Sequence, residues 1–185
     1  MVTRSIRIWA LLALGTVAAS QPAARPPATA TSGTIVRTQQ IHAAFTLNLV
    51  RFVTWPEGTF AQADAPLVVG TLPRDPINDE LDAVAQNEKV EGRPVQTIRI
   101  QSLDDVAKCH VVYLSQTVGR QNAVLERTAG KPILTISDAE GFLELGGHVR
   151  FVTGGARTGL RISVDNVRAS RLEVRAQLLR IAAAP

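Results

Sequence analysis

The sequence has a single cysteine, Cys109, among its 185 residues, and aromatic side chains make up only 4% of it. One cysteine cannot close a disulfide within the chain, and no Cys/His cluster has the spacing of a structural zinc site. No apolar run reaches the roughly 20 residues that a membrane-spanning helix needs. The folded state must therefore be stabilised by side-chain packing rather than by disulfides or a structural metal.

Lysine is also scarce, since only three of the 20 basic residues are lysines. Acidic residues are missing before Pro56, whereas residues 57–144 hold fourteen acidic and eight basic side chains, and residues 150–185 hold seven arginines and two acids. No basic run is interleaved with aromatic residues, which argues against a nucleic-acid-binding protein. A sequence whose middle is acidic and whose two ends are basic suits a protein partner better than nucleic acid.

The first 20 residues have the three parts of a secretory signal peptide. Arg4 and Arg7 give a positive start, residues 8–19 are apolar, and small residues precede a cleavage site near Ser20. An uncleaved membrane anchor is the alternative, but the apolar stretch is too short to span a bilayer. Residues 21–33, rich in Pro, Ala and Thr, are predicted to form a disordered linker. One exported domain, residues 34–185, remains.

A long amphipathic helix is predicted at the start of this domain. Ile41, Phe45, Leu49 and Phe52 recur at three- and four-residue spacing, so they would form one apolar face of a helix over residues 35–54. Trp55-Pro56 would end it, because proline disfavours helical geometry in the residue before it. Asn48 lies on the same stripe and is expected to be a buried hydrogen-bonding residue rather than a partner contact.

The rest of the domain predicts a single α/β fold. Short apolar runs that read as buried strands alternate with helical segments, so the central sheet should be largely parallel and flanked by helices. After residue 141 the pattern changes to an antiparallel hairpin followed by a terminal helix. The predicted strands are residues 66–72, 95–100, 109–115 and 133–137, the helices 75–86 and 118–128, the hairpin 149–153 with 160–164, and the terminal helix 172–181.

Polar loops follow the predicted parallel strands and would meet at the carboxyl edge of the sheet, where open α/β sheets bind ligands. The same residue types cap helices and satisfy backbone groups, so a small-molecule site and a set of helix caps both stay open. A hydrolase that uses Ser137 and Asp138 is a further alternative. The candidate loop residues are Thr71, Asp75, Ser115, Thr117, Ser137 and Asp138.

Other candidate groups have ordinary structural explanations. Cys109 and His110 could be a nucleophile and its base, but neighbours in a strand point to opposite faces, so we predict a buried structural cysteine. The three histidines lack metal-site spacing. Exposed arginines near the C-terminus could contact a partner or simply be solvated, and the helix that Trp55 follows is a second candidate surface. The arginines are Arg168, Arg171, Arg175 and Arg180.

Five short motifs recur in the order and spacing of a known family and cover about residues 39–182. The first contains Phe45, Asn48, Phe52, Trp55 and Pro56 in the pattern A-A-F-x-x-N-x-x-x-F-V-x-W-P. The others are residues 109–115, 135–138 with Gly141-Phe142, Gly146-Gly147, and 177–179 with Ile181-Ala182. In these motifs the chain resembles the YfiR-like family of bacterial periplasmic proteins.

The resemblance implies a regulator in the periplasm rather than an enzyme, with no catalytic residue, cofactor or metal. Such a protein would bind the periplasmic domain of an inner-membrane diguanylate cyclase or related sensor protein and repress it, which lowers cyclic di-GMP and biofilm formation. It also implies a homodimer. Two departures stand out: Cys109 matches a family cysteine but has no partner for an internal disulfide, and Ser163 replaces a usual asparagine.

Overall fold

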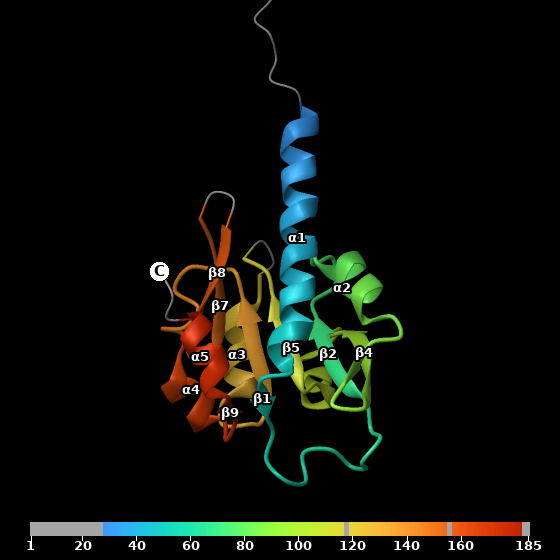
Figure 1. Ribbon diagram of the computed structural model, residues 1–185, viewed down its shortest axis with the longest axis vertical. Helices are drawn as coiled ribbons and strands as arrows, with labels where there is room; N and C mark the ends of the chain where they lie inside the picture. The colour runs from blue at the N-terminus through green and yellow to red at the C-terminus, as the bar shows by residue number, and fades with distance from the viewer. Residues whose placement is uncertain (1–27, 117–118, 155–156, 183–185) are drawn as a thin grey trace, which may run out of the picture.

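A computed structural model of the protein describes residues 28–116, 119–154 and 157–182. Within them, a seven-stranded sheet forms the centre, in the order β3-β4-β2-β5-β6-β7-β8 (Figure 1). Strands β4, β2, β5, β6 and β7 are parallel, and β3 and β8 add antiparallel edges. The predicted α/β fold with a largely parallel sheet and a C-terminal hairpin is confirmed. The strands are β2 (Leu67–Thr71), β3 (Lys89–Val90), β4 (Arg93–Arg99), β5 (Val111–Leu114), β6 (Leu134–Ser137), β7 (Val149–Gly154) and β8 (Arg157–Ile162).

Helices cover both faces of the sheet. One core packs α1, α2, α4 and α5 against it, and the other packs the 3₁₀-helix η1 and α3. Strand β5 contributes to both cores, with Val111 and Tyr113 in the first and Val112 and Leu114 in the second, because successive strand side chains point to opposite faces. The helices are α1 (Ala28–Val50), α2 (Asn78–Ala85), η1 (Leu103–Lys108), α3 (Gln121–Thr128), α4 (Val164–Ala169) and α5 (Ala176–Ala182).

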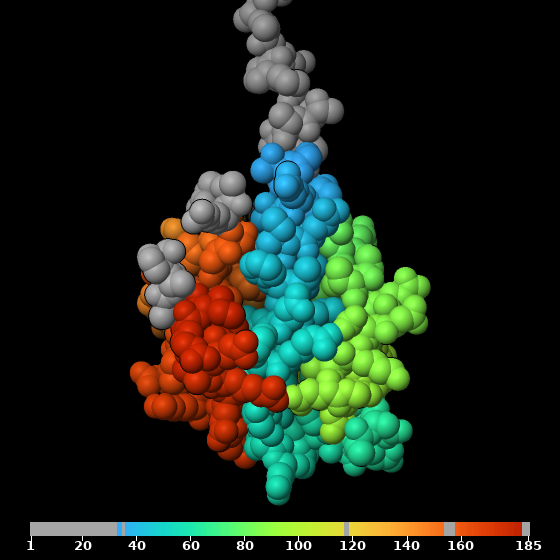
Figure 2. Space-filling view, in the orientation of Figure 1, coloured from blue at the N-terminus to red at the C-terminus, as the bar shows by residue number. Residues whose placement is uncertain are grey.

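Helix α1 lies across the middle of one face of the molecule (Figure 2), but it buries a different stripe from the predicted one. Of the predicted apolar residues only Leu49 is fully buried, while Phe45 is 38% exposed and Asn48 is exposed. The prediction of a buried Asn48 is therefore wrong. The buried stripe mixes small, apolar and polar residues, which hydropathy spacing does not detect; it comprises Gln39, His42, Ala43, Thr46, Leu47 and Val50.

Both ends of α1 differ from the prediction. The helix begins at Ala28, so residues 28–33 are helical and not part of a disordered linker; the predicted signal peptide lies outside the described residues. The helix ends at Val50 rather than at residue 54, because Val53 and Thr54 form strand β1, which pairs with β9 (Glu173–Val174). Among the described residues, no helix is both long and apolar enough to cross a bilayer.

The pairing of β1 with β9 also corrects the predicted terminal helix. Residues 172–181 were expected to be helical throughout, but Glu173 and Val174 form β9 and α5 begins only at Ala176. The short helix α4, which the sequence did not predict, precedes β9 and α5. Its N-cap is Ser163, and the hydroxyl oxygen of Ser163 accepts a hydrogen bond from Asn166 N. The serine that departs from the resemblance thus works as a helix cap.

Candidate functional site

The predicted polar loops do converge, because β2, β5 and β6 are parallel neighbours whose carboxyl ends lie at one edge of the sheet. Asp75 is buried there, and burial raises the pKa of its carboxyl group. Its Oδ1 accepts a hydrogen bond from Ile77 N at 3.1 Å and its Oδ2 accepts one from Ser115 N at 3.0 Å. Asp75 therefore ties the loop before α2 to the end of β5. It is not the residue that caps α2, which begins at Asn78.

Two further candidate loop residues also use their hydroxyl groups inside the protein. Thr71 Oγ1 donates to Asn78 Oδ1 at 2.6 Å, and Ser137 Oγ donates to the Leu114 carbonyl oxygen and accepts from Ala139 N. These contacts favour the capping alternative, and they give Ser137 no base that could activate it as a nucleophile. Thr117 lies outside the described residues.

An open cleft of about 590 Å³ lies beside these loops, between α1 and β7. It forms because β7 continues beyond β6: the two strands pair only at Ile136 with Val149 and Ser137 with Arg150, after which β6 ends. The volume lies within the roughly 300–1,000 Å³ of small-molecule pockets. The cleft is lined by Thr38, His42, Gln116, Asp138, Glu140, Arg150, Phe151, Val152 and Thr153.

His42, which lines the cleft, is paired with the buried Tyr113 behind it. His42 is 0% exposed, its Nδ1 lies 2.9 Å from Tyr113 Oη, and its ring stacks on Phe151 at 4.8 Å. Burial lowers the pKa of His42 and raises the pKa of Tyr113, so His42 is neutral and Tyr113 keeps its proton at neutral pH. Either group can donate the hydrogen bond between Tyr113 Oη and His42 Nδ1, according to which ring nitrogen of the neutral His42 carries the proton.

Arg150, Asp138 and Glu140 are the charged residues that line the cleft. A guanidinium nitrogen of Arg150 lies 3.3 Å from Glu140 Oε1, and Asp138 Oδ1 accepts a hydrogen bond from Gln116 N at 2.7 Å. Neither Arg150 Nε nor His42 Nε2 has a hydrogen-bond partner among the described residues, although both atoms are buried. Buried polar atoms without partners are rare in folded proteins; Gln39 Oε1 and Trp55 Nε1 are two others among the described residues.

The sequence predicted that Asp138 and the loop containing Gln116 would lie at this edge, but it missed His42 and Arg150. Only the β6–β7 register brings Arg150 next to the end of β6, and only the packing of α1 brings His42 to Phe151. In the part of the chain that the structure describes, no three Cys, His, Asp or Glu residues are grouped so that they could hold a metal ion. The polar and charged side chains that line the cleft can form hydrogen bonds and ion pairs.

Trp55 of the first motif has a structural role at the opposite end of the sheet. Its ring meets Phe60 edge-on at 6.0 Å, Phe60 stacks on His110 at 4.4 Å, and the Arg93 guanidinium lies 4.0 Å above the Phe60 ring. Arg93 also donates to the carbonyl oxygens of Gln62 and Ala65. These contacts fasten the loop between β1 and β2 to the sheet.

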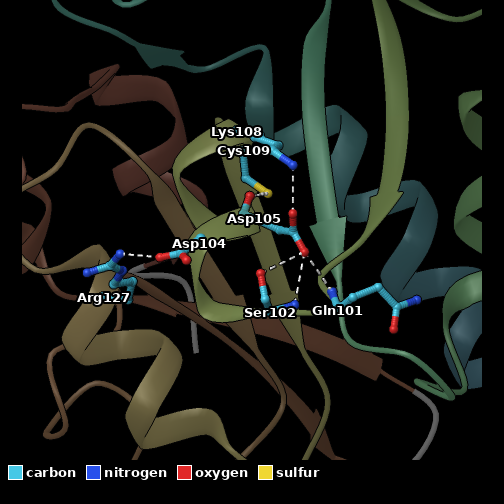
Figure 3. A network of polar contacts seen from close by, with 7 residues as sticks. All are labelled: Gln101, Ser102, Asp104, Asp105, Lys108, Cys109 and Arg127. Atoms are coloured by element: carbon cyan, nitrogen blue, oxygen red, sulfur yellow. Dashed lines mark hydrogen bonds and ion pairs between the residues drawn. The ribbon is translucent and has the colours of Figure 1, made fainter.

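Cys109 is buried beneath η1 (Figure 3). Its Sγ donates to the Asp105 carbonyl oxygen at 3.5 Å, while His110 lies on the opposite side of the strand against Phe60. The Asp105 carboxylate accepts hydrogen bonds from Lys108 Nζ at 2.7 Å and from Ser102 N at 2.9 Å. These bonds lower the pKa of Asp105 to about 2. Burial raises the pKa of the Cys109 thiol to about 12, so it is an inert structural thiol, as predicted.

The native protein should therefore react very slowly with thiol reagents. At pH 8 only about one Cys109 in 10,000 would be a thiolate, against roughly a quarter of an unperturbed cysteine, so labelling should be slowed by about 1,000-fold or more. The measurement is the rate of reaction with a disulfide reagent, with the denatured protein as the control that reveals one reactive thiol. Labelling of the native protein at the denatured rate would contradict this burial.

The four candidate arginines all lie exposed in the C-terminal segment made of α4, β9 and α5. This segment is coloured red and forms one side of the visible face in Figure 2. Arg175 pairs with Glu91, whereas Arg168, Arg171 and Arg180 make no ion pair with any residue that the structure describes. We call Arg168, Arg171 and Arg180 the arginine surface.

Residues 39–183 match a family model described as YfiR/HmsC-like. No curated protein matches the chain significantly. The matched residues contain the whole seven-stranded sheet, the arginine surface and every residue that lines the cleft except Thr38; helix α1 is matched from residue 39 onward. The motifs in the sequence and the match over most of the chain agree, so this chain belongs to the YfiR/HmsC-like family.

Proposed function

We propose that this protein is exported to the periplasm, binds the periplasmic domain of an inner-membrane diguanylate cyclase, and holds that cyclase inactive. Family membership carries the proposal, since the YfiR-like family is regulatory and suggests a periplasmic regulator of a diguanylate cyclase. The structure is compatible with action by contact, because the polar groups of Ser137 and Cys109 are buried and occupied rather than poised for catalysis. Repression would lower cyclic di-GMP and biofilm formation.

A deletion strain tests this function. Loss of the gene should raise cellular cyclic di-GMP, and a plasmid copy with its signal peptide should restore the original level. Deletion of the target cyclase in the same strain should abolish the rise, which also identifies the partner. An unchanged cyclic di-GMP level in the deletion strain, under conditions in which the protein is produced, would remove the basis of the repressor proposal.

The arginine surface is our candidate for the contact with the cyclase. Three exposed guanidinium groups that form no ion pair with a described residue can steer and bind an acidic partner. The cleft between α1 and β7 favours a second function, the small-molecule binding module that the sequence also predicted. The two are compatible, because a regulator can have a ligand site as input and a protein surface as output.

Reversal of charge on the arginine surface should abolish repression without unfolding the protein. We expect Arg168→Glu/Arg171→Glu to weaken cyclase binding at least about tenfold and to leave cyclic di-GMP near the level of the deletion strain. The matched control is Arg74→Glu/Arg120→Glu, which changes two other exposed arginines, and Arg120, like Arg171, has a positive φ. Equal repression by both double variants would exclude this surface as the contact.

A further inference from the structure

We propose that the free edge of β8 binds an extended segment of the partner cyclase as an additional strand, and that apolar and acidic side chains alternate along this segment. The inference rests on the proposed function, because it names a backbone contact through which the cyclase would be held. This edge continues into the arginine surface, since α4, which carries Arg168, directly follows β8.

Strand β8 has backbone groups that no other strand uses. It is the last strand of the seven-stranded sheet, and no strand that the structure describes pairs with its other side. Ser163 N donates to the His148 carbonyl oxygen at 2.9 Å, so alternate residues of β8 bond to β7 and the residues between them point away. The outward set is Thr158, Leu160 and Ile162, and no loop or helix among the described residues hydrogen-bonds to their backbone. These N–H and C=O groups are therefore available to a further strand.

The side chains of β8 define the chemistry of the added strand. Leu160 and Ile162 are partly buried and pack against the core that holds α1, so apolar neighbours on the same face would extend that core. Arg161 points to the opposite face, is exposed, and makes no ion pair with a residue that the structure describes, so it suits an acidic neighbour. A Cβ at Gly159 would meet only the Val152 carbonyl oxygen, at 3.9 Å, which leaves room there for a large side chain of the partner.

The charge around β8 favours an acidic segment of another protein over a second copy of this chain. Residues 145–164 contain no acidic side chain, so a second β8 would bring no carboxylate to Arg161. Arg168 lies in the helix that follows β8, and Arg180 lies in α5, which contacts β8. The exposed arginines of these elements add to the attraction for an acidic strand and would repel another basic one.

Amide hydrogen exchange of the mature protein, measured residue by residue with and without the full-length cyclase in lipid nanodiscs, tests the added strand. In the free protein the amides of Leu160 and Ile162 should exchange at least about tenfold faster than that of Arg161, which bonds to β7. In the complex, the amides of Leu160 and Ile162 should slow by at least about tenfold. A complex that leaves these two amides fast would overturn the added strand but not repression, whereas failure to form any complex would overturn both.

Two variants separate the backbone contact from the charge. Thr158→Pro removes one outward N–H but leaves the bonds to β7, and it should weaken cyclase binding at least about tenfold. Its matched control, Thr158→Val, loses the same hydroxyl but keeps the N–H, so it should bind as the unmodified protein does. Arg161→Glu changes an exposed side chain without touching the backbone and should also weaken binding about tenfold or more, whereas Arg74→Glu, another exposed arginine, should not. Equal binding by the two Thr158 variants would overturn the added strand, and undiminished binding by Arg161→Glu would overturn its acidic character.

Discussion

Phe142→Ala is expected to lower the free energy of unfolding by about 3–5 kcal/mol, the usual cost of removing a buried aromatic ring. Phe142 is 0% exposed and packs in the core under η1 and α3. Gly147 N donates to the Phe142 carbonyl oxygen at 2.9 Å, so the ring is held under the turn that follows it. Unfolding in urea at neutral pH measures the change, and Leu145→Ala, 54% exposed in the same turn, should change stability by less than about 0.5 kcal/mol.

The same packing explains the glycine at position 147. A Cβ at this position would come within 2.3 Å of two carbon atoms of the Phe142 ring, so Gly147→Ala should cost about 1–3 kcal/mol through overpacking. In the double variant the new methyl group has room, because the ring is gone. The combined loss should therefore be smaller than the sum of the single losses. Strict additivity would contradict a direct contact between the two residues.

His148 should make the protein sensitive to mild acid. It is 3% exposed, its Nδ1 accepts from Thr135 N at 2.9 Å, and its Nε2 lies 2.9 Å from Ser170 Oγ. Burial lowers the pKa of His148 from 6.5 to about 4. Above pH 6.5 the ring is neutral in both states, whereas between pH 6.5 and 4 the unfolded chain binds a proton that the folded protein does not. The free energy of unfolding should therefore fall by about 3 kcal/mol over this range.

Other groups modify this pH dependence in known directions. Burial also lowers the pKa values of His42 and His110, so they add to the loss of stability as the pH falls. Burial raises the pKa of Asp75, which acts in the opposite direction, since a raised carboxyl pKa makes the folded state more stable as the pH falls. The lowered pKa of Asp105 acts only at more acidic pH, from about 3.8 down to 2.

The variant His148→Asn isolates the contribution of His148. Asparagine can still accept from Thr135 N but does not titrate, so the variant should be less stable at pH 7 and should lose less stability on acidification. The stability gap to the unmodified protein should narrow by about 3 kcal/mol between pH 7 and 4. Leu178→Ala removes a buried side chain that does not titrate, so the difference in its free energy of unfolding from the unmodified protein should stay constant between pH 7 and 4. A constant gap for His148→Asn would show that His148 is protonated in the folded state.

The sequence predicted the sheet well and the α1 contacts poorly, for a physical reason. Buried parallel strands such as β5 are continuous apolar runs, so hydropathy alone detects them. The buried face of α1 instead holds polar residues that find partners inside the protein: Thr46 Oγ1 donates to the His42 carbonyl oxygen at 2.8 Å, and His42 pairs with Tyr113. A hydropathy pattern therefore placed Phe45 on the core face and gave no place to His42.

The residues that line the cleft were likewise predicted only in part. Polar residues after buried strands predicted the correct edge of the sheet and included Asp138. Gln116 and Glu140 also come from the loops after buried strands. His42 and Arg150 come from α1 and β7, far from Asp138 along the chain or brought in by strand register, and neither source leaves a local motif. Strands β1 and β9 are two residues each, too short for any pattern, yet their pairing sets where α1 ends.

The most direct test of repression is the activity of the partner cyclase itself, identified as the one whose deletion suppresses the cyclic di-GMP rise. The full-length cyclase in lipid nanodiscs would be assayed for cyclic di-GMP synthesis while the mature protein is added in increasing amounts. The account predicts that synthesis falls to a low plateau, and that Arg168→Glu/Arg171→Glu requires at least about tenfold more protein to reach it. An unchanged rate of synthesis at saturating amounts of the unmodified protein would contradict it.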